Sequence, residues 1–149
     1  MFNFYAREND KGFPGMKANV TVDVCDSFAA ESGIDPGEAV IRGTNPDTQV
    51  KAVATAADIG KIIGIAVHTH KEPTPGEKYY ADGDTVSVMT FGDIYVLAAG
   101  DIAAGEAVEV KIENSAGVFV GGGAGTKVEG MTYTESGAAG EIVCVRIRK

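Results

Sequence analysis

Residues 80–112 read YADGDTVSVMTFGDIYVLAAGDIAAGEAVEVKI, and this stretch decides the fold class. Three short runs in it alternate apolar with polar residues: 86–90 (VSVMT), 94–96 (IYV) and 108–112 (VEVKI). Successive side chains of a strand point to opposite faces, so the alternation predicts strands with one buried face. On this interpretation Ser87, Glu109 and Lys111 face water. Glycine-containing turns between the runs indicate short antiparallel strands.

Bulk composition narrows the possible classes of protein. The chain has 149 residues, of which 44% are hydrophobic, so one domain with a real core is expected. The 20 glycines lie between apolar runs, as tight turns require. A net charge of −8 argues against non-specific binding to nucleic acid, whose phosphates attract basic surfaces. No apolar run is long enough to predict a membrane span, and the first residues do not resemble a secretory signal.

The cysteines and the C-terminus carry weaker signals. Cys25 and Cys144 are far apart and form no CxxC pair, which fits a reducing compartment and two small core residues. The basic residues 146–149 (RIRK) are typical of an edge strand whose exposed face carries charge against aggregation.

Further strands and one helix follow from the pattern. Residues 54–61 (ATAADIGK) are the best helix candidate, with Thr55 as a possible cap, whereas 26–33 (DSFAAESG) predicts a helical turn or a loop. Residues 71–76 (KEPTPG) hold two prolines, which predicts a loop. Strands are expected at 20–24, 38–42, 49–53, 62–68, 118–120, 128–134 and 141–148, with 62–68 buried on both faces.

The order of these signals occurs twice. Four pairs of segments match: 36–40 (PGEAV) with 104–108 (AGEAV), the hairpin loop 44–48 with 114–117, 62–67 (IIGIAV) with 128–133 (VEGMTY), and 83–88 (GDTVSV) with 140–145 (GEIVCV). The two units cover about 36–90 and 104–149, with 91–104 as a bridge. Together they predict an all-β fold: a small β-barrel or β-sandwich of short antiparallel strands with an internal repeat and at most one short helix.

Residues 1–19 differ from the rest and are assigned as an N-terminal arm, ahead of a β-barrel domain at 20–149. The arm holds aromatic residues without a steady period, and Gly12, Pro14 and Gly15 interrupt regular structure. Such a segment either folds back over its own core or packs on a partner, and the sequence leaves both open.

The strongest candidate for chemistry is the run His68-Thr69-His70. Two histidines two apart on a strand share a face and could grip a metal ion with Glu72 or Glu77, which loosely resembles a cupin motif. However, the chain has 2 histidines, too few for a His-rich site. The glycines at 121–125 lack a phosphate-loop pattern, and no GxSxG elbow occurs. We therefore predict no catalytic residue, metal or cofactor, and a structural or binding role.

Four segments, taken in order, resemble a known family: 12–19 (GFPGMKAN), 64–67 (GIAV) followed by 83–88, 102–108 (IAAGEAV), and 140–147 (GEIVCVRI). They are similar to the capsid cement, or decoration, proteins of tailed bacteriophages. Each motif is only a turn and a strand, so the resemblance rests on their order. It covers most of the chain from about Gly12 onward.

The resemblance implies a barrel that docks on the outer surface of the phage head and clamps neighbouring subunits of the major capsid protein. It implies a homo-oligomer, commonly a trimer, made in the host cytoplasm and carried on the virion. Contacts with the capsid are then expected from the arm, at Phe2, Phe4, Tyr5, Phe13, Pro14 and Met16. Two alternatives remain: a cupin-like metal-dependent enzyme using His68 and His70, and another virion barrel from the tail or baseplate.

Overall fold

A computed structural model describes residues 12–19 and 22–148. Within these residues the chain forms strands and one short 3₁₀ helix, η1 (Ala56–Lys61). The strands are β1 (Val24–Ala30), β2 (Ala39–Arg42), β3 (Gln49–Ala52), β4 (Gly64–Ala66), β5 (Thr85–Leu97), β6 (Ala107–Glu113), β7 (Ala116–Val120), β8 (Thr126–Tyr133) and β9 (Ile142–Arg148). The prediction of an all-β fold with at most one short helix is confirmed.

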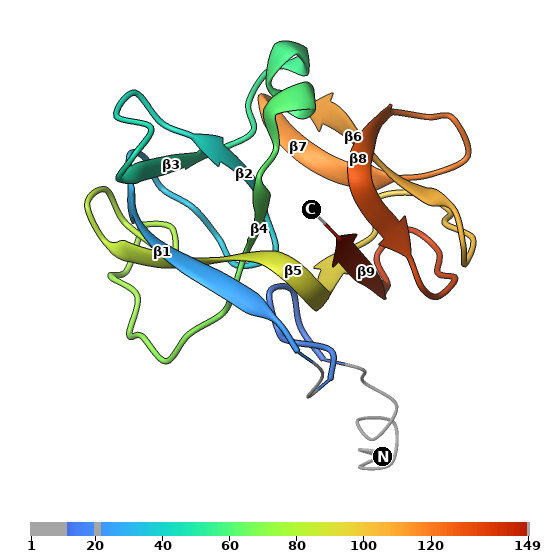
Figure 1. Cartoon of the computed structure of the whole chain (residues 1–149), viewed down its shortest axis with the longest axis horizontal. Coiled ribbons are helices and arrows are strands. Elements are labelled where there is room, and N and C mark those ends of the chain that lie inside the picture. The colour runs from blue at the N-terminus through green and yellow to red at the C-terminus, as the bar shows by residue number, and fades with distance from the viewer. Residues whose placement is uncertain (1–11, 20–21, 149) are drawn as a thin grey trace.

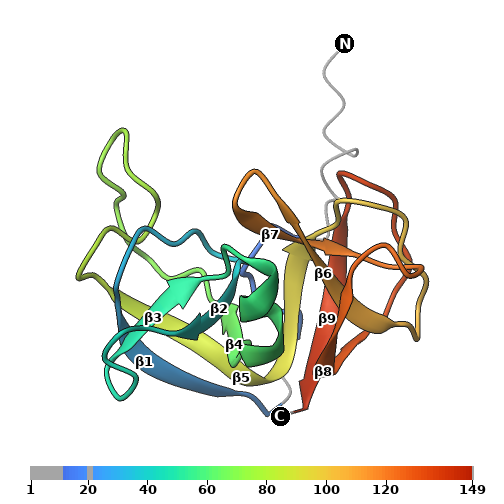
Figure 2. The ribbon, with the colours of Figure 1, turned by 90° about the horizontal axis from the view of Figure 1, so that it is seen from above.

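The strands form two lobes that share β5, as Figures 1 and 2 show from two sides. The order in the sheet is β1-β3-β2-β4-β5-β9-β8-β6-β7, and β1 also pairs with β5. The first lobe, made of β1 to β4 and the N-terminal half of β5, is therefore a closed five-stranded barrel. The second lobe, made of the C-terminal half of β5 and β6 to β9, nearly closes through a parallel bridge between Ala98 and Phe119.

The strand β5 joins the two lobes. The sequence predicts two short strands at 86–90 and 94–96, but the structure has one strand of 13 residues. Its first half pairs with β1 and β4, and its second half pairs with β9. Gly92 lies between the halves with φ 132°, and a Cβ there would lie 2.7 Å from the Cβ of Asp23. Glycine lets the strand continue through this crowded point.

The internal repeat is present, and it begins earlier than the matched sequence segments. In the first lobe Ala29 pairs with Thr85, and in the second Leu97 pairs with Ile142. The first strand of each unit, β1 and the C-terminal half of β5, therefore corresponds with an offset of 68 residues. The last strand of each unit, the N-terminal half of β5 and β9, corresponds with an offset of 57. The turns match as well: Gly37 N donates to Ala66 O and Gly105 N to Tyr133 O, both at 2.8 Å. The C-terminal half of β5 is thus the opening strand of the second unit, not a bridge.

One part of the sequence match is displaced by one residue. The match pairs Gly64 with Gly130, but the strand register makes Met131 the equivalent of Gly64, because Ala39 faces Ile65 and Ala107 faces Thr132. The cause is an irregularity in the pairing of β6 with β8, near Gly130, whose φ is 79°. A bulge adds a residue that sequence comparison cannot place.

Three of the predicted segments differ most from the structure. Residues 26–33 do not form a helical turn or a loop throughout, because β1 runs to Ala30; Phe28 and Ala30 point into the barrel, where burial overrides local preference. The strand expected at 62–68 is only Gly64–Ala66, although all three of its residues are buried as predicted. Of the strand expected at 20–24, only Val24 lies in β1: residues 22–23 are not in a strand, and residues 20–21 lie outside the described residues.

In the part of the chain that the structure describes, buried apolar side chains form two clusters. The smaller fills the first barrel and includes Ile34, Val40, Tyr80 and Val88. The larger fills the second lobe and continues onto η1 and the outer faces of β2 and β4. Each fully buried side chain of this size contributes about 1.5–3 kcal/mol. The lobes are therefore held together by a shared core as well as by β5.

Two predicted surface features are buried or paired instead. Glu109 is only 4% exposed, and its carboxylate accepts hydrogen bonds from Gly123 N at 3.1 Å and Gly125 N at 3.0 Å, so it organises the glycine-rich loop.

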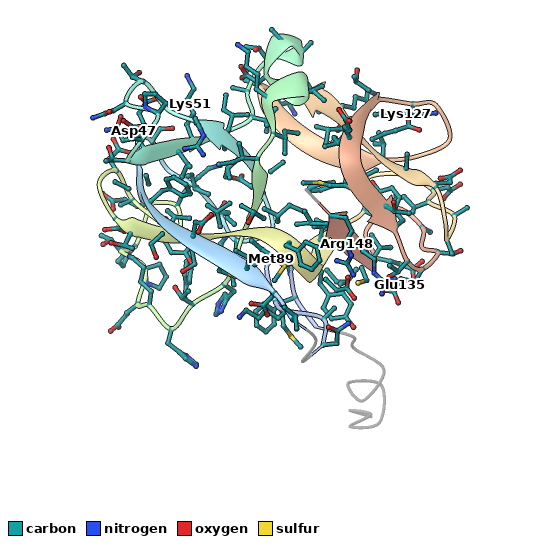
Figure 3. The ribbon with its side chains drawn as sticks, in the orientation of Figure 1. Asp47, Lys51, Met89, Lys127, Glu135 and Arg148 are labelled. Atoms are coloured by element: carbon teal, nitrogen blue, oxygen red, sulfur yellow. The ribbon has the colours of Figure 1, made fainter. Side chains whose placement is uncertain are left out.

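The basic C-terminal strand is not an edge strand, since β9 lies between β5 and β8. Its Arg148 lies beside β5, 4.5 Å from the Phe91 ring (Figure 3). Cys144 is buried, Cys25 is half-buried, and both are free thiols.

Candidate functional site

The described part of the arm, residues 12–19, lies against its own barrel. It runs antiparallel to the second half of β5, with Lys17 facing Ile94. Gly15 N donates to Tyr95 O at 2.8 Å, and Tyr95 N donates to Met16 O at 2.9 Å. Ala18 N donates to Asp93 O at 3.0 Å. These residues thus add a short strand to the sheet edge, and we call them the arm segment.

Two glycines allow the arm segment to sit close to the turn before β2. Gly15 and Gly37 have φ values of 84° and 87°, which glycine adopts readily. A Cβ on Gly15 would lie 2.5 Å from the Pro36 Cβ, and one on Gly37 would lie 2.6 Å from the Pro14 Cβ. Gly15 O also accepts a hydrogen bond from His68 N at 2.8 Å. Any side chain at either glycine would push the arm segment off the barrel.

Polar contacts fix the other end of the arm segment. Lys17 Nζ lies 3.2 Å from Asp23 Oδ1, and Asn19 Nδ2 donates to Asp93 Oδ2 at 2.8 Å. Asp93 is buried and also accepts two hydrogen bonds from Arg146. These guanidinium bonds lower the pKa of the Asp93 carboxyl, against the opposing effect of burial. The carboxylate therefore stays charged and ties the arm to β5 and β9.

The candidate contact residues lie in different environments. Phe13 is 44% exposed, with its ring edge-to-face against His68 at 4.6 Å between centroids. Pro14 and Met16 are half-buried against the barrel. The remaining candidates, Phe2, Phe4 and Tyr5, lie outside the described residues. Of the described candidates, Phe13 is the one that presents an exposed aromatic face.

An apolar hollow of about 200 Å³ lies beside Pro14, and its lining includes Pro36, Leu97, Val118 and Phe119. Leu97 is 51% exposed. Neither Leu97 nor Val118 is among the contact residues predicted from the sequence. A signal was available for Leu97: Ile94 and Val96 face inward, so the alternation places Leu97 outward as an exposed apolar residue.

The run His68-Thr69-His70 does not lie on a strand, because β4 ends at Ala66. The expectation that both imidazoles share a strand face is therefore wrong. His68 packs between Phe13 and Tyr79, with 4.9 Å between the His68 and Tyr79 centroids, and His70 is exposed. Among residues 12–19 and 22–148, no group of three or more His, Cys, Asp or Glu side chains could hold a metal ion.

The loop at 71–76 is anchored at its base. The Tyr79 hydroxyl donates to Thr69 O and accepts a hydrogen bond from Lys71 N at 3.1 Å. Lys71 Nζ lies 3.0 Å from Asp84 Oδ2, and this ion pair lowers the pKa of the Asp84 carboxyl. Residues 72–76 themselves are exposed. The loop therefore projects from a fixed base.

In the described residues, no helix is long and apolar enough to cross a membrane.

Comparison with known proteins finds a solved structure of the same fold and a matching family. A solved structure titled "The capsid of Myoviridae Phage XM1" shares the fold, with a TM-score of 0.71 and 18% identity over 94% of this chain and 92% of the other. A second, "The crystal structure of head fiber gp8.5 N base in bacteriophage phi29", gives a TM-score of 0.45 and 17% identity over 85% and 95%. No curated protein matches the sequence. Residues 2–148 match the family described as "Structural cement protein (E217 gp24/Pam3 gp6)", and the chain belongs to this family of phage structural proteins.

Proposed function

We propose that the protein binds the outer surface of the phage head and stabilises it by bridging neighbouring subunits of the major capsid protein. The observation that carries this proposal is the match of residues 2–148 to a family of structural cement proteins. The net charge of −8 supports a position outside the shell, away from packaged DNA. The role requires no catalysis and no cofactor.

The stabilisation follows from preferential binding. A protein that binds two neighbouring subunits at once binds the assembled shell but not separated subunits, so its binding free energy adds to the cost of disassembly. Each contact can be weak, because two linked contacts and many copies act together. A homo-oligomer, with a trimer favoured, would increase this effect by multiplying the contacts of one particle.

The arm is the proposed contact with the major capsid protein. We assign direct contact with the capsid to Phe2, Phe4, Tyr5 and Phe13. The half-buried Pro14 and Met16 are expected to contribute by packing the arm segment against the barrel. Support comes from the exposed face of Phe13 and from the apolar hollow with exposed Leu97 next to it. Exposed apolar residues grouped in this way are typical of protein-binding surfaces.

The test uses purified heads that lack this protein. Wild type and a variant consisting of residues 12–149 are added, and bound copies and the temperature of head disruption are measured. We expect wild type to saturate the heads and raise that temperature, and the variant to bind at least ten-fold more weakly with an unchanged melting temperature of its own. Normal binding of the shortened variant would remove Phe2, Phe4 and Tyr5 from the proposed contact. Absence of wild-type binding would contradict the function itself.

A further inference from the structure

Because of the repeat, β1 and the C-terminal half of β5 are equivalent strands with equivalent edges, and the arm segment pairs with the β5 edge. The arm segment pairs with the edge of β5 at Asp93 and Tyr95. The shared register, Ala29 with Thr85 and Leu97 with Ile142, makes Cys25 and Ser27 on β1 the equivalents of these two residues. We call the stretch 25–27 the β1 edge.

The backbone of the β1 edge points away from its partner strand. In an antiparallel pair, facing residues alternate between those that bond each other and those that turn their backbone groups outward. Ser87 faces Ser27, and Ser87 O accepts a hydrogen bond from Val67 N at 2.8 Å on the β4 side. Ser27 therefore turns its N–H and C=O to the opposite side. On that side β3 pairs only with Ala29 and Ala30, and among the described residues no strand pairs with the β1 edge.

The surface around this edge is open and partly apolar. Asp26 and Ser27 are exposed, and Val24 beside them is 46% exposed. An open edge with exposed apolar side chains is a ready template for another extended chain. The Asp26 carboxylate is a charged group that disfavours pairing with an acidic strand and favours pairing with a basic one.

We propose that the β1 edge binds an extended segment of a major capsid protein subunit, which adds to the sheet as an antiparallel strand. This inference rests on the proposed function and names a second contact, distinct from the arm, as bridging requires. The arm segment shows what such a guest looks like. Its Lys17 faces Ile94, the equivalent of Asp26, which fixes the register expected of the guest. Because opposite charges in facing positions stabilise a strand pair, the guest is expected to place a Lys or Arg opposite Asp26.

A second copy of this chain fits the β1 edge less well. Two β1 edges related by a two-fold axis through their centres would bring the two Asp26 carboxylates directly opposite each other. Like charges in facing positions destabilise a strand pair. Charge complementarity therefore favours a basic segment from a different protein.

The experiment compares Ser27→Pro with Ser27→Ala in binding to heads that lack this protein. Proline removes the outward N–H that the guest needs, whereas alanine keeps it. Within residues 12–19 and 22–148 that N–H points away from β5 and faces no paired strand. We expect Ser27→Pro to weaken binding at least ten-fold and Ser27→Ala to leave it unchanged. In parallel, hydrogen exchange at the wild-type Ser27 amide is expected to slow at least ten-fold on binding to heads, a readout independent of whether the proline variant folds.

The outcomes separate this inference from the proposed function. If wild type does not bind heads, the function fails. If wild type binds heads but Ser27 exchange is unchanged on binding, the inference is overturned and the function stands; equal binding by a folded Ser27→Pro variant leads to the same conclusion. If the Ser27 amide of free wild type is protected in a concentration-dependent way, a second copy occupies the edge and the inference is likewise overturned.

Discussion

Arg146 on β9 holds Asp93 on β5 through two charged hydrogen bonds, Nε to Oδ1 at 3.0 Å and Nη2 to Oδ2 at 3.1 Å. The Asp93 carboxylate also accepts a bond from Asn19 at the end of the arm segment. One buried carboxylate thus joins the closing strand of the second lobe, the shared strand β5 and the arm. Such bidentate pairs hold geometry as well as charge.

Replacing Arg146 should destabilise the fold. In Arg146→Met the Asp93 carboxylate keeps its bond from Asn19 but loses both charged hydrogen bonds from Arg146, so we expect a measurable fall in the free energy of unfolding. The matched control is Lys127→Met, a long exposed cation on β8 (Figure 3), which should change it by less than about 0.5 kcal/mol. Urea unfolding of both variants checks this. Equal stability of the two variants would contradict the assigned role.

The same pair predicts a pH dependence. The pKa of Asp93 is lower in the folded chain than in the unfolded chain because of Arg146. The ionised carboxylate therefore stabilises the fold above the ordinary aspartate pKa of about 3.9, and this contribution is lost as the pH falls through the lowered pKa. The destabilisation in Arg146→Met should be largest near pH 7 and shrink below about pH 4. Unfolding measured across this range tests it, and a constant difference would refute it.

Gly15→Ala should release the arm segment from the barrel. The variant combines a φ of 84° with a Cβ 2.5 Å from Pro36, so we expect a loss of about 2–3 kcal/mol and faster hydrogen exchange at Tyr95 N–H, which bonds to Met16 O. Gly76→Ala is the control: its φ is also 84°, but nothing lies within 4 Å of the added Cβ. It should show only the backbone cost of about 1 kcal/mol. Unchanged exchange at Tyr95 in Gly15→Ala would show that the contact is not needed.

Glu109→Ala should disorder the glycine-rich loop. The change leaves the amides of Gly123 and Gly125 without their carboxylate acceptor, which should cost about 2–3 kcal/mol and speed their hydrogen exchange. Glu129→Ala, on the exposed surface of β8, should have little effect on either measurement. Similar results for the two variants would mean that the buried carboxylate does not organise the loop.

The apolar hollow can be tested through Leu97. Because this side chain is 51% exposed, Leu97→Glu should change the stability of the free protein by less than about 1 kcal/mol. It should nevertheless weaken binding to heads several-fold, since it places a charge beside Pro14 in the proposed contact. Thr132→Glu, exposed on β8, introduces the same charge elsewhere and should bind normally. Normal binding of Leu97→Glu would exclude the hollow from the contact surface.

Alternation and turn residues were sufficient to predict the all-β fold and the repeat, because both depend on local periodicity. They could not show that 86–90 and 94–96 form one strand, since Gly92 is compatible with either a turn or a distorted strand. They also predicted that the Glu109 side chain is exposed to solvent, because alternation does not show that the neighbouring loop folds over its carboxylate. The displaced match at Gly130 has the same origin: a bulge depends on pairing between distant segments.

Less of the candidate site was predictable. The aromatic residues at 1–19 predicted a contact-forming arm, and the described part of this arm, 12–19, includes the exposed Phe13. Gly15 packs against the turn at Pro36 and Gly37 through a close contact between two distant backbone segments. The spacing of residues along the sequence does not predict such a contact. The open β1 edge could not be found from sequence either, because an edge is defined by which strands do not pair with it.

The most direct test of the central claim is the density for this protein on decorated heads, measured by cryo-electron microscopy at a resolution that traces the chain. We predict density on the outer surface, with each copy contacting at least two major capsid protein subunits, the arm on one and β1 on another. Density inside the shell, or copies that each contact a single subunit, would contradict it.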